Sequence, residues 1–221
     1  MTVLYEDNHI IIVNKASGEI IQGDKTGDKP LSEIVKEYLK EKYNKPGNVF
    51  CGVTHRLDRP TTGVVVFAKT SKALSRLNEM FRNNETDRIY WAIVKNTPSK
   101  PEDRLVHWLI KNEKTNKSTA YDKEKQGAKK AVMHYKIIGV AKNYLLLEVN
   151  LITGRHHQIR TQLAKIGSPI KGDLKYGAKR SNPDGSISLH ARCISFIHPV
   201  SNKKIEITAP VPDDNLWKSF T

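Results

Sequence analysis

The sequence predicts an α+β fold, in which helices flank a mixed, largely antiparallel sheet. Two observations predict it: short apolar segments with strand-like patterns recur along the chain, and only three stretches have helical spacing. The strands come in runs with helices inserted between them, rather than in strict alternation with helices, and this order is typical of α+β proteins. We expect one domain over residues 1–221, because a chain of this length can form a single core.

The first half of the chain is expected to begin with a hairpin around the turn-prone pair Asp7-Asn8. A helix follows, because Leu31, Val35 and Leu39 recur at helical spacing while Lys and Glu fill the opposite face. The expected elements are strands at 3–6 and 10–14, a helix at 31–43, a buried strand at 63–68, a helix from the N-cap Thr70-Ser71 to about 82, and a strand at 89–94.

The second half is expected to contain two strand pairs and one short helix. Gly167 should end the helix, and Lys142-Asn143 should join the first strand pair. Residues 97–126 are polar and irregular apart from an apolar stretch at 105–110, and we expect loops there. The expected elements are strands at 131–140 and 144–151, a helix at 158–166, and strands at 187–197 and 204–208.

The charge balance favours a polyanionic partner. Lys and Arg number 37 against 23 Asp and Glu, for a formal net charge of +14. Such cations displace the counterions condensed on phosphate, so nucleic acid is the first candidate, with residues 97–126 as RNA-facing loops, and an anionic membrane is the second. No apolar run approaches the ~18 residues of a spanning helix, and no segment resembles a signal peptide. We therefore expect no membrane partner and a cytoplasmic protein.

Cofactor motifs are missing from the sequence. It contains neither GxGxxG nor a P-loop, which argues against a nucleotide cofactor. Cys51 and Cys193 lie far apart and form no CxxC pair, so neither a zinc site nor a disulfide framework is indicated.

The segment from His55 to Gly63 is the most unusual charged cluster. It directly precedes the buried strand, and loops held by rigid strands commonly carry catalytic groups. Asp58 lies between Arg56 and Arg59, whose positive charges favour a carboxylate available as nucleophile or base. A solvated turn with surface ion pairs explains the same residues, so their spacing alone leaves both interpretations open.

A second cluster, TGRHHQIR at residues 153–160, lies where a strand gives way to a helix. The first turn of a helix has unpaired N–H groups, which together with Arg155 and Arg160 could bind phosphate or a carboxylate. His156 and His157 could instead serve as polar caps. They have no acidic residue at helical spacing, so the HExxH pattern is not met and we expect no metal.

Five segments, in this order, resemble the motifs of RluA-type RNA pseudouridine synthases. They are VLYED at 3–7 with Asn14-Lys15; HRLD at 55–58 with TTG at 61–63 and AKT at 68–70; RIYWA at 88–92; TGRHHQIR at 153–160 with PIKGD at 169–173 and Tyr176-Gly177; and LHA at 189–191 with His198-Pro199. The resemblance extends from residue 3 to about 199. Five motifs in the family's order are not explained by coincidence.

The resemblance implies a role for each matched residue. Asp58 would be the carboxylate that acts at the ribose, with Arg160 as its ion-pair partner, and Tyr90 would stack on the target base and help to remove its C5 proton. Leu189 would line the pocket, and Arg56 would enter the RNA stack in place of the extruded uridine. Further contacts to RNA or to the base are expected from His55, Arg59, Arg155 and His157.

Three positions depart from the family pattern. Ala16, Arg88 and Gln162 stand where proline, lysine and histidine are common. We expect them to bear on substrate choice more than on chemistry. The chain is expected to begin directly at the catalytic domain, without the S4-like domain of many relatives, and to act as a monomer. RNA affinity would then come from its own basic surface.

The implied reaction breaks the N1–C1′ bond of a flipped-out uridine, turns the base and joins C5 to C1′, and it needs no cofactor. One carboxylate could attack C1′ or remove the C2′ proton, and the sequence leaves both routes open. Ribosomal and transfer RNA are both open as substrates. Two rival functions are a non-catalytic RNA-binding module and a carboxylate hydrolase. The hydrolase needs a second carboxylate, for which Asp173 is the candidate, although it could equally be a turn residue.

Overall fold

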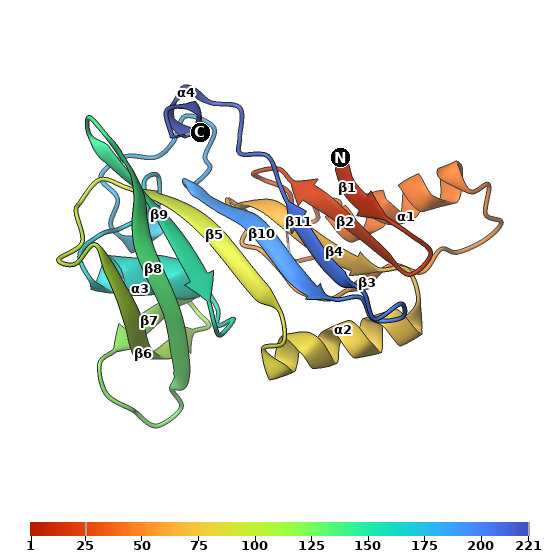
Figure 1. Ribbon diagram of the computed structural model, residues 1–221, viewed down its shortest axis with the longest axis horizontal. Coiled ribbons are helices and arrows are strands. Elements are labelled where there is room, and N and C mark those ends of the chain that lie inside the picture. The colour runs from red at the N-terminus through yellow and green to blue at the C-terminus, as the bar shows by residue number, and fades with distance from the viewer. Residues whose placement is uncertain (25, 221) are drawn as a thin grey trace. The chain divides into compact units, whose positions relative to one another are not determined.

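The computed structural model describes residues 1–24 and 26–220, which form two compact units (Figure 1). Unit 1 consists of Met1–Thr86 and Arg192–Pro210, and unit 2 consists of Asp87–Ala191 and Val211–Thr221. Residues 25 and 221, which fall within the expected domain, lie outside the described residues. Both units combine sheet and helix, which confirms the α+β class.

Unit 1 is built on antiparallel strand pairs. Its strands are β1 (Thr2–Glu6), β2 (Ile10–Lys15), β3 (Gly52–Val53), β4 (Thr62–Ala68), β11 (Lys204–Thr208) and most of β10 (Leu189–Ile197). The pairs β1/β2, β2/β4, β3/β4 and β10/β11 are antiparallel. Every residue of β4 after Thr62 is buried, as the apolar run predicts. The strands predicted at 3–6, 10–14, 63–68 and 204–208 are therefore confirmed.

Two helices complete unit 1. Helix α1 (Leu31–Lys42) begins after Pro30 and buries Leu31, Val35 and Leu39, the residues whose spacing predicts it. Helix α2 (Ser71–Asn83) begins at the predicted cap, where the Thr70 hydroxyl accepts a hydrogen bond from the Ala73 N–H at 3.2 Å. Its buried residues join the core formed by the apolar side chains of β2, β4 and β10.

Unit 2 contains a second run of antiparallel strands. Across this part of the sheet they follow the order β5 (Asp87–Val94), β9 (Tyr144–Leu151), β8 (Lys129–Ala141), β6 (Glu102–Asn112) and β7 (Lys117–Tyr121). Helix α3 (Gln158–Lys165) packs against β6 and β7. Two short helices, η1 (Leu174–Tyr176) and α4 (Asn215–Lys218), were not expected from the sequence.

One prediction in unit 2 is wrong. Residues 97–126 were expected to be irregular loops, yet they contain β6 and β7 (Figure 1). Along β6 the buried side chains alternate, with Leu105, His107 and Leu109 facing inward. The other face carries the apolar residues Val106, Trp108 and Ile110, and a histidine lies within the buried series, so the sequence shows no alternation of apolar and polar residues here.

No helix among the described residues is long and apolar enough to cross a membrane.

Candidate active site

The loop that carries Asp58 connects β3 to β4 in unit 1. The start of the loop is anchored because Val53 pairs with Phe67 across the two strands, and Leu57 within the loop is buried. The Thr61 N–H donates to the Asp58 carbonyl at 2.9 Å, which closes a tight turn. Asp58 itself is half-buried. The carboxylate is thus held on a short loop between two paired strands, as its position before the buried strand predicts.

A buried lysine fixes the backbone immediately after Asp58. Lys15 is only 1% exposed, and its ammonium donates to the carbonyls of Ala16, Arg59 and Thr61 at 2.9, 3.0 and 2.7 Å. Burial lowers the pKa of Lys15 to about 8, although the negative charges of Glu19 and Asp58 oppose this shift. Two of the three donors of the ammonium therefore hold the loop, and the third binds the carbonyl of the neighbouring Ala16.

Lys15 is a residue that sequence reasoning placed in a motif without giving it a role. A signal was present, since a lysine lies two residues after the apolar stretch Ile10–Val13, where a charge is hard to solvate. The local strand explains the position: β2 pairs with β4, and Lys15 lies opposite Gly63 at the start of β4.

The other predicted residues of this loop have different surroundings. The His55 ring accepts the Val66 N–H at its Nε2 (3.1 Å) and stacks on Phe81 with centroids 4.7 Å apart, so it is tied to β4 and α2. Arg56 and Arg59 are exposed, and Arg59 pairs with Asp28 at 2.6 Å. Both partners of this ion pair are about half exposed, so it adds little to stability.

In unit 2, Tyr90 lies on β5 and is 8% exposed. Arg88 is two residues earlier on the same strand, so both side chains leave the same face. Arg88 is also buried, and its Nη2 donates to the Ile152 carbonyl at 3.1 Å. A Cβ at Gly154 would lie 2.8 Å from Nη1 of Arg88, so this glycine makes room for the guanidinium. Burial lowers the pKa of Arg88, and the nearby Tyr90 opposes that effect.

The turn before α3 is organised by Gln158. Its Oε1 accepts hydrogen bonds from the Thr153 hydroxyl (2.8 Å) and from the Arg155 N–H (3.0 Å). Its Nε2 donates to the Val132 carbonyl at 3.1 Å, which ties the turn to β8. The Arg155 guanidinium donates to the Lys130 carbonyl through Nε at 3.0 Å. The second predicted cluster is therefore a rigid turn rather than a mobile loop.

Arg160, on α3, makes a two-pronged ion pair with Asp173. Nε and Nη2 of Arg160 donate to Oδ2 and Oδ1 of Asp173 at 2.7 and 2.8 Å. The two side chains are 6% and 1% exposed. The planar guanidinium matches the carboxylate geometry, so this contact fixes the plane of Arg160 as well as its position. The sequence left Asp173 open as a second catalytic carboxylate or a turn residue; its carboxylate is in fact an ion-pair partner.

Tyr176 connects Arg160 to the histidine pair. The Arg160 guanidinium lies over the Tyr176 ring, 5.1 Å from its centroid. The Tyr176 hydroxyl accepts the Ser118 N–H at 2.8 Å and lies 2.9 Å from Nδ1 of His157. Burial raises the pKa of Tyr176, so the phenol keeps its proton and can donate it to Nδ1.

His157 and its neighbour form a stacked pair, with ring centroids 3.7 Å apart. His157 is the N-cap of α3 and has a left-handed backbone with φ of 52°. The polar-cap interpretation of the sequence expected a side-chain cap, but His157 makes no such hydrogen bond to the helix. Its side chain is directed to Tyr176 instead. Leu189, the remaining predicted residue, is 4% exposed at the start of β10.

The structure shows the contacts of the three residues that depart from the family pattern. Ala16 begins a turn in which its N–H donates to Glu19 at 2.8 Å. The Arg88 guanidinium occupies the space that a Cβ at position 154 would fill. Gln162 is fully buried on α3, where its Nε2 contacts Nδ1 of His107 at 2.9 Å and links the helix to β6. Gln162 therefore serves packing between helix and sheet.

Comparisons with known proteins identify the family of this chain. The protein family described as RNA pseudouridylate synthase matches residues 9–165. Ribosomal large subunit pseudouridine synthase D of Zymomonas mobilis is 31% identical over 97% of this chain and 70% of its own length. tRNA pseudouridine synthase C of Vibrio parahaemolyticus is 28% identical over all of this chain and 94% of its own length. The solved structure of human RNA pseudouridylate synthase domain containing 4 has the same fold, with a TM-score of 0.80, 22% identity, and coverage of 96% of this chain and 89% of that one.

The chain therefore belongs to the RluA-type family of RNA pseudouridine synthases. It is an isomerase that converts uridine in RNA to pseudouridine, and the family resemblance seen in the sequence is confirmed. The two rival functions, a non-catalytic RNA-binding module and a carboxylate hydrolase, are set aside by this membership.

Proposed function

We propose that this protein isomerises specific uridines in structured ribosomal or transfer RNA, in the cytoplasm, with Asp58 as the catalytic carboxylate. The observation that carries the assignment of Asp58 is the loop around it, whose carbonyls at Arg59 and Thr61 are held by the buried Lys15. A carboxylate that reacts at one atom of a sugar has to be held in place, and preorganisation of this kind is what catalysis requires. The named relatives act on large-subunit ribosomal RNA and on tRNA, which supports the substrate class.

In the proposed reaction, Asp58 acts at the ribose of a uridine that has left the RNA stack. The N1–C1′ bond breaks, the base turns, C5 bonds to C1′, and the C5 proton is lost while N1 gains one. Atoms and charge balance without a cofactor. Attack at C1′ and removal of the C2′ proton are both consistent with a single carboxylate.

Arg160 and Tyr90 would assist Asp58 in the proposed reaction. The Arg160 guanidinium would pair with Asp58, which stays a prediction; the contact of Arg160 with Asp173 supports it by fixing the guanidinium plane. Tyr90 would stack on the base and take the C5 proton, and its burial on β5 suits a group that excludes water. Leu189 would line the base pocket beside it.

Contacts to the RNA are proposed for the cationic and histidine residues of the two clusters. Arg56 would fill the gap left by the flipped uridine, since a planar guanidinium stacks between bases. His157 would offer its Nε2–H as a donor to phosphate or base oxygen. The remaining proposed contacts are His55, Arg59 and Arg155.

Mapping pseudouridine in total RNA, with and without this gene product, tests the proposed substrate. Sites in ribosomal or transfer RNA should lose pseudouridine without the protein and regain it when the wild-type chain is restored. A full set of pseudouridines in both RNA classes without the protein would contradict the proposal.

We further propose that the two compact units act together as one catalytic domain and as a monomer. A single cooperative unfolding transition would support the first point, because independent domains unfold separately. Sedimentation at the mass of one 25.1 kDa chain would support the second.

A further inference from the structure

The exposed aromatic side chains of this protein are confined to one short segment of unit 1. Of its 3 Trp, 8 Tyr and 5 Phe residues, all within the described part of the chain, only Tyr43 and Phe50 are exposed, each to 45%. Every other aromatic ring is buried or half-buried. Exposed aromatic rings within one short segment are a common sign of a binding surface.

The same segment, residues 40–50, is basic. It contains Lys40, Lys42 and Lys45 against one acidic residue, Glu41, and all of its residues except Val49 are exposed. Lysines alternating with exposed rings are typical of surfaces that bind unpaired nucleotides, where cations follow the phosphates and bases stack on the rings.

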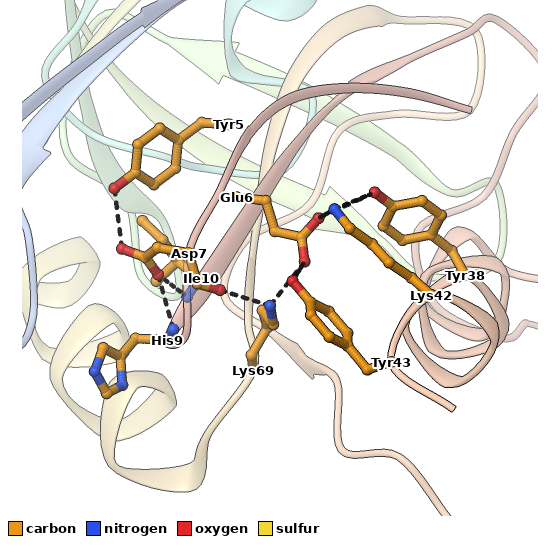
Figure 2. A network of polar contacts seen from close by, with 9 residues as sticks. All are labelled: Tyr5, Glu6, Asp7, His9, Ile10, Tyr38, Lys42, Tyr43 and Lys69. Carbon is orange, nitrogen blue, oxygen red and sulfur yellow. Dashed lines mark hydrogen bonds and ion pairs between the residues drawn. The ribbon is translucent and has the colours of Figure 1, made fainter. Parts of the chain in front are cut away.

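The segment is held in place by Glu6, as Figure 2 shows. The Glu6 carboxylate, 7% exposed on β1, accepts hydrogen bonds from Lys42 and Tyr43 at 2.8 and 2.7 Å. It also accepts from Tyr38 (3.0 Å) and from the buried Lys69 (2.8 Å). Two lysines thus compensate the negative charge of Glu6, so it does not repel a phosphate backbone.

These contacts preorganise Tyr43. Its hydroxyl is fixed on Glu6, and the Lys69 ammonium lies 4.8 Å from its ring centroid. The chain then turns at Asn44, which has a left-handed φ of 47°, and the Lys45 N–H returns to the Lys40 carbonyl at 3.0 Å. A ring that is already ordered loses little entropy when a base stacks on it.

We infer that residues 40–50 form an accessory RNA-binding surface, which takes unpaired nucleotides of the substrate outside the catalytic pocket. Tyr43 and Phe50 provide the stacking faces, and Lys40 and Lys45 contact the phosphates. The inference rests on the proposed action on structured RNA, whose loops supply unpaired bases. RNA is favoured over a protein partner because the segment combines net positive charge with rings, whereas protein interfaces are depleted in lysine.

The test measures RNA binding directly, so that it does not depend on turnover. Transcripts of transfer RNA and of large-subunit ribosomal RNA are titrated with wild type, with Tyr43→Ala plus Phe50→Ala, and with Lys40→Ala plus Lys45→Ala. The aromatic pair should weaken binding by about tenfold or more. The lysine pair should flatten the plot of log K against log salt by about 1.4, since two phosphate contacts to single-stranded RNA are lost. KM should rise in parallel, with kcat nearly unchanged.

Matched variants elsewhere in unit 1 serve as controls. Ile197→Ala removes an apolar side chain of similar exposure (46%), and Lys72→Ala plus Lys203→Ala removes two exposed cations. Both should bind RNA nearly as wild type does. Transcripts with 4-thiouridine should crosslink to Tyr43 or Phe50.

Equal losses in the segment variants and the controls, or the absence of such crosslinks, would overturn the inference. A wild type that binds RNA at this segment but converts no uridine would instead overturn the proposed function alone.

Discussion

Arg160 and Asp173 meet in a buried two-pronged ion pair, in which Nε and Nη2 of the guanidinium donate to the two carboxylate oxygens at 2.7 and 2.8 Å. We propose that Asp173 acts on the chemistry only through Arg160, as a positioning residue. The contact uses one edge of the guanidinium and fixes its plane, which leaves the other donors with a defined direction.

Replacing Asp173 by Asn should reduce both stability and activity. A buried guanidinium without its carboxylate costs about 3–5 kcal/mol of unfolding free energy. Arg160→Lys should also recover little activity, because a point charge cannot make the planar contact. Denaturant unfolding and single-turnover rates of both variants test this. Wild-type rates in Arg160→Lys would show that the two-pronged geometry is not needed.

Lys15→Met should lower activity on the order of tenfold to a hundredfold, because the loop that carries Asp58 loses its anchor.

The contribution of Lys15 to the free energy of unfolding should change with pH in a defined direction. Since the pKa of Lys15 is lowered from 10.5 to about 8, the unfolded chain binds more protons between these values, and this group's contribution to stability rises with pH there. The stability difference between wild type and Lys15→Met should therefore shift in favour of wild type by about 1 kcal/mol from pH 7 to pH 9. A difference that is constant over this range would contradict the buried, charged lysine.

Glu6 should make an acid-labile contribution to stability. Burial alone would raise its pKa, but hydrogen bonds from Lys42, Lys69, Tyr43 and Tyr38 outweigh burial and lower it from 4.5 to about 2. A lowered carboxyl pKa stabilises the fold above the unfolded value, and this stability is lost as the pH falls from about 4.5 to 2. Wild type should exceed Glu6→Gln by about 2–3 kcal/mol at pH 7 and approach it near pH 2. Parallel pH curves for the two proteins would rule out this role.

Tyr90→Phe separates stacking from proton transfer. The ring stays and only the hydroxyl is lost, so binding should persist while loss of the C5 proton slows. A species with C5 already joined to the ribose should accumulate in single turnover, since a late block leaves the earlier steps running. If Tyr90→Phe behaves as wild type and Tyr90→Leu fails, Tyr90 is a stacking residue and another group takes the proton.

The sequence predicts most of the fold because the relevant patterns are local. The apolar run before Lys69 predicts β4, and the Thr70 cap predicts the start of α2. Strands β6 and β7 were missed because they are specified by pairing, of β6 with β8 and of β7 with β6, rather than by a local pattern. Pairings between strands that lie far apart in the sequence have no local signal.

The candidate site was likewise predicted only where its signals are local in the sequence. The motifs of the sequence include Asp58, Tyr90 and Arg160, but they do not show what holds each of them. The contacts of Lys15 with the Arg59 and Thr61 carbonyls and the contact of Asp173 with Arg160 join residues that the sequence separates. A lysine that follows an apolar strand and an acidic residue in a Gly-Asp turn were visible signals, yet only the folded chain identifies their partners.

Asp58→Asn tests the central claim most directly. The change is nearly isosteric and removes only the charge and basicity of one carboxyl group, so the fold and RNA binding should remain. Pseudouridine formation on a substrate RNA should fall to background, without accumulation of a C5-joined species. Retained turnover by Asp58→Asn, with RNA binding equal to wild type, would contradict the assignment of Asp58 as the catalytic carboxylate.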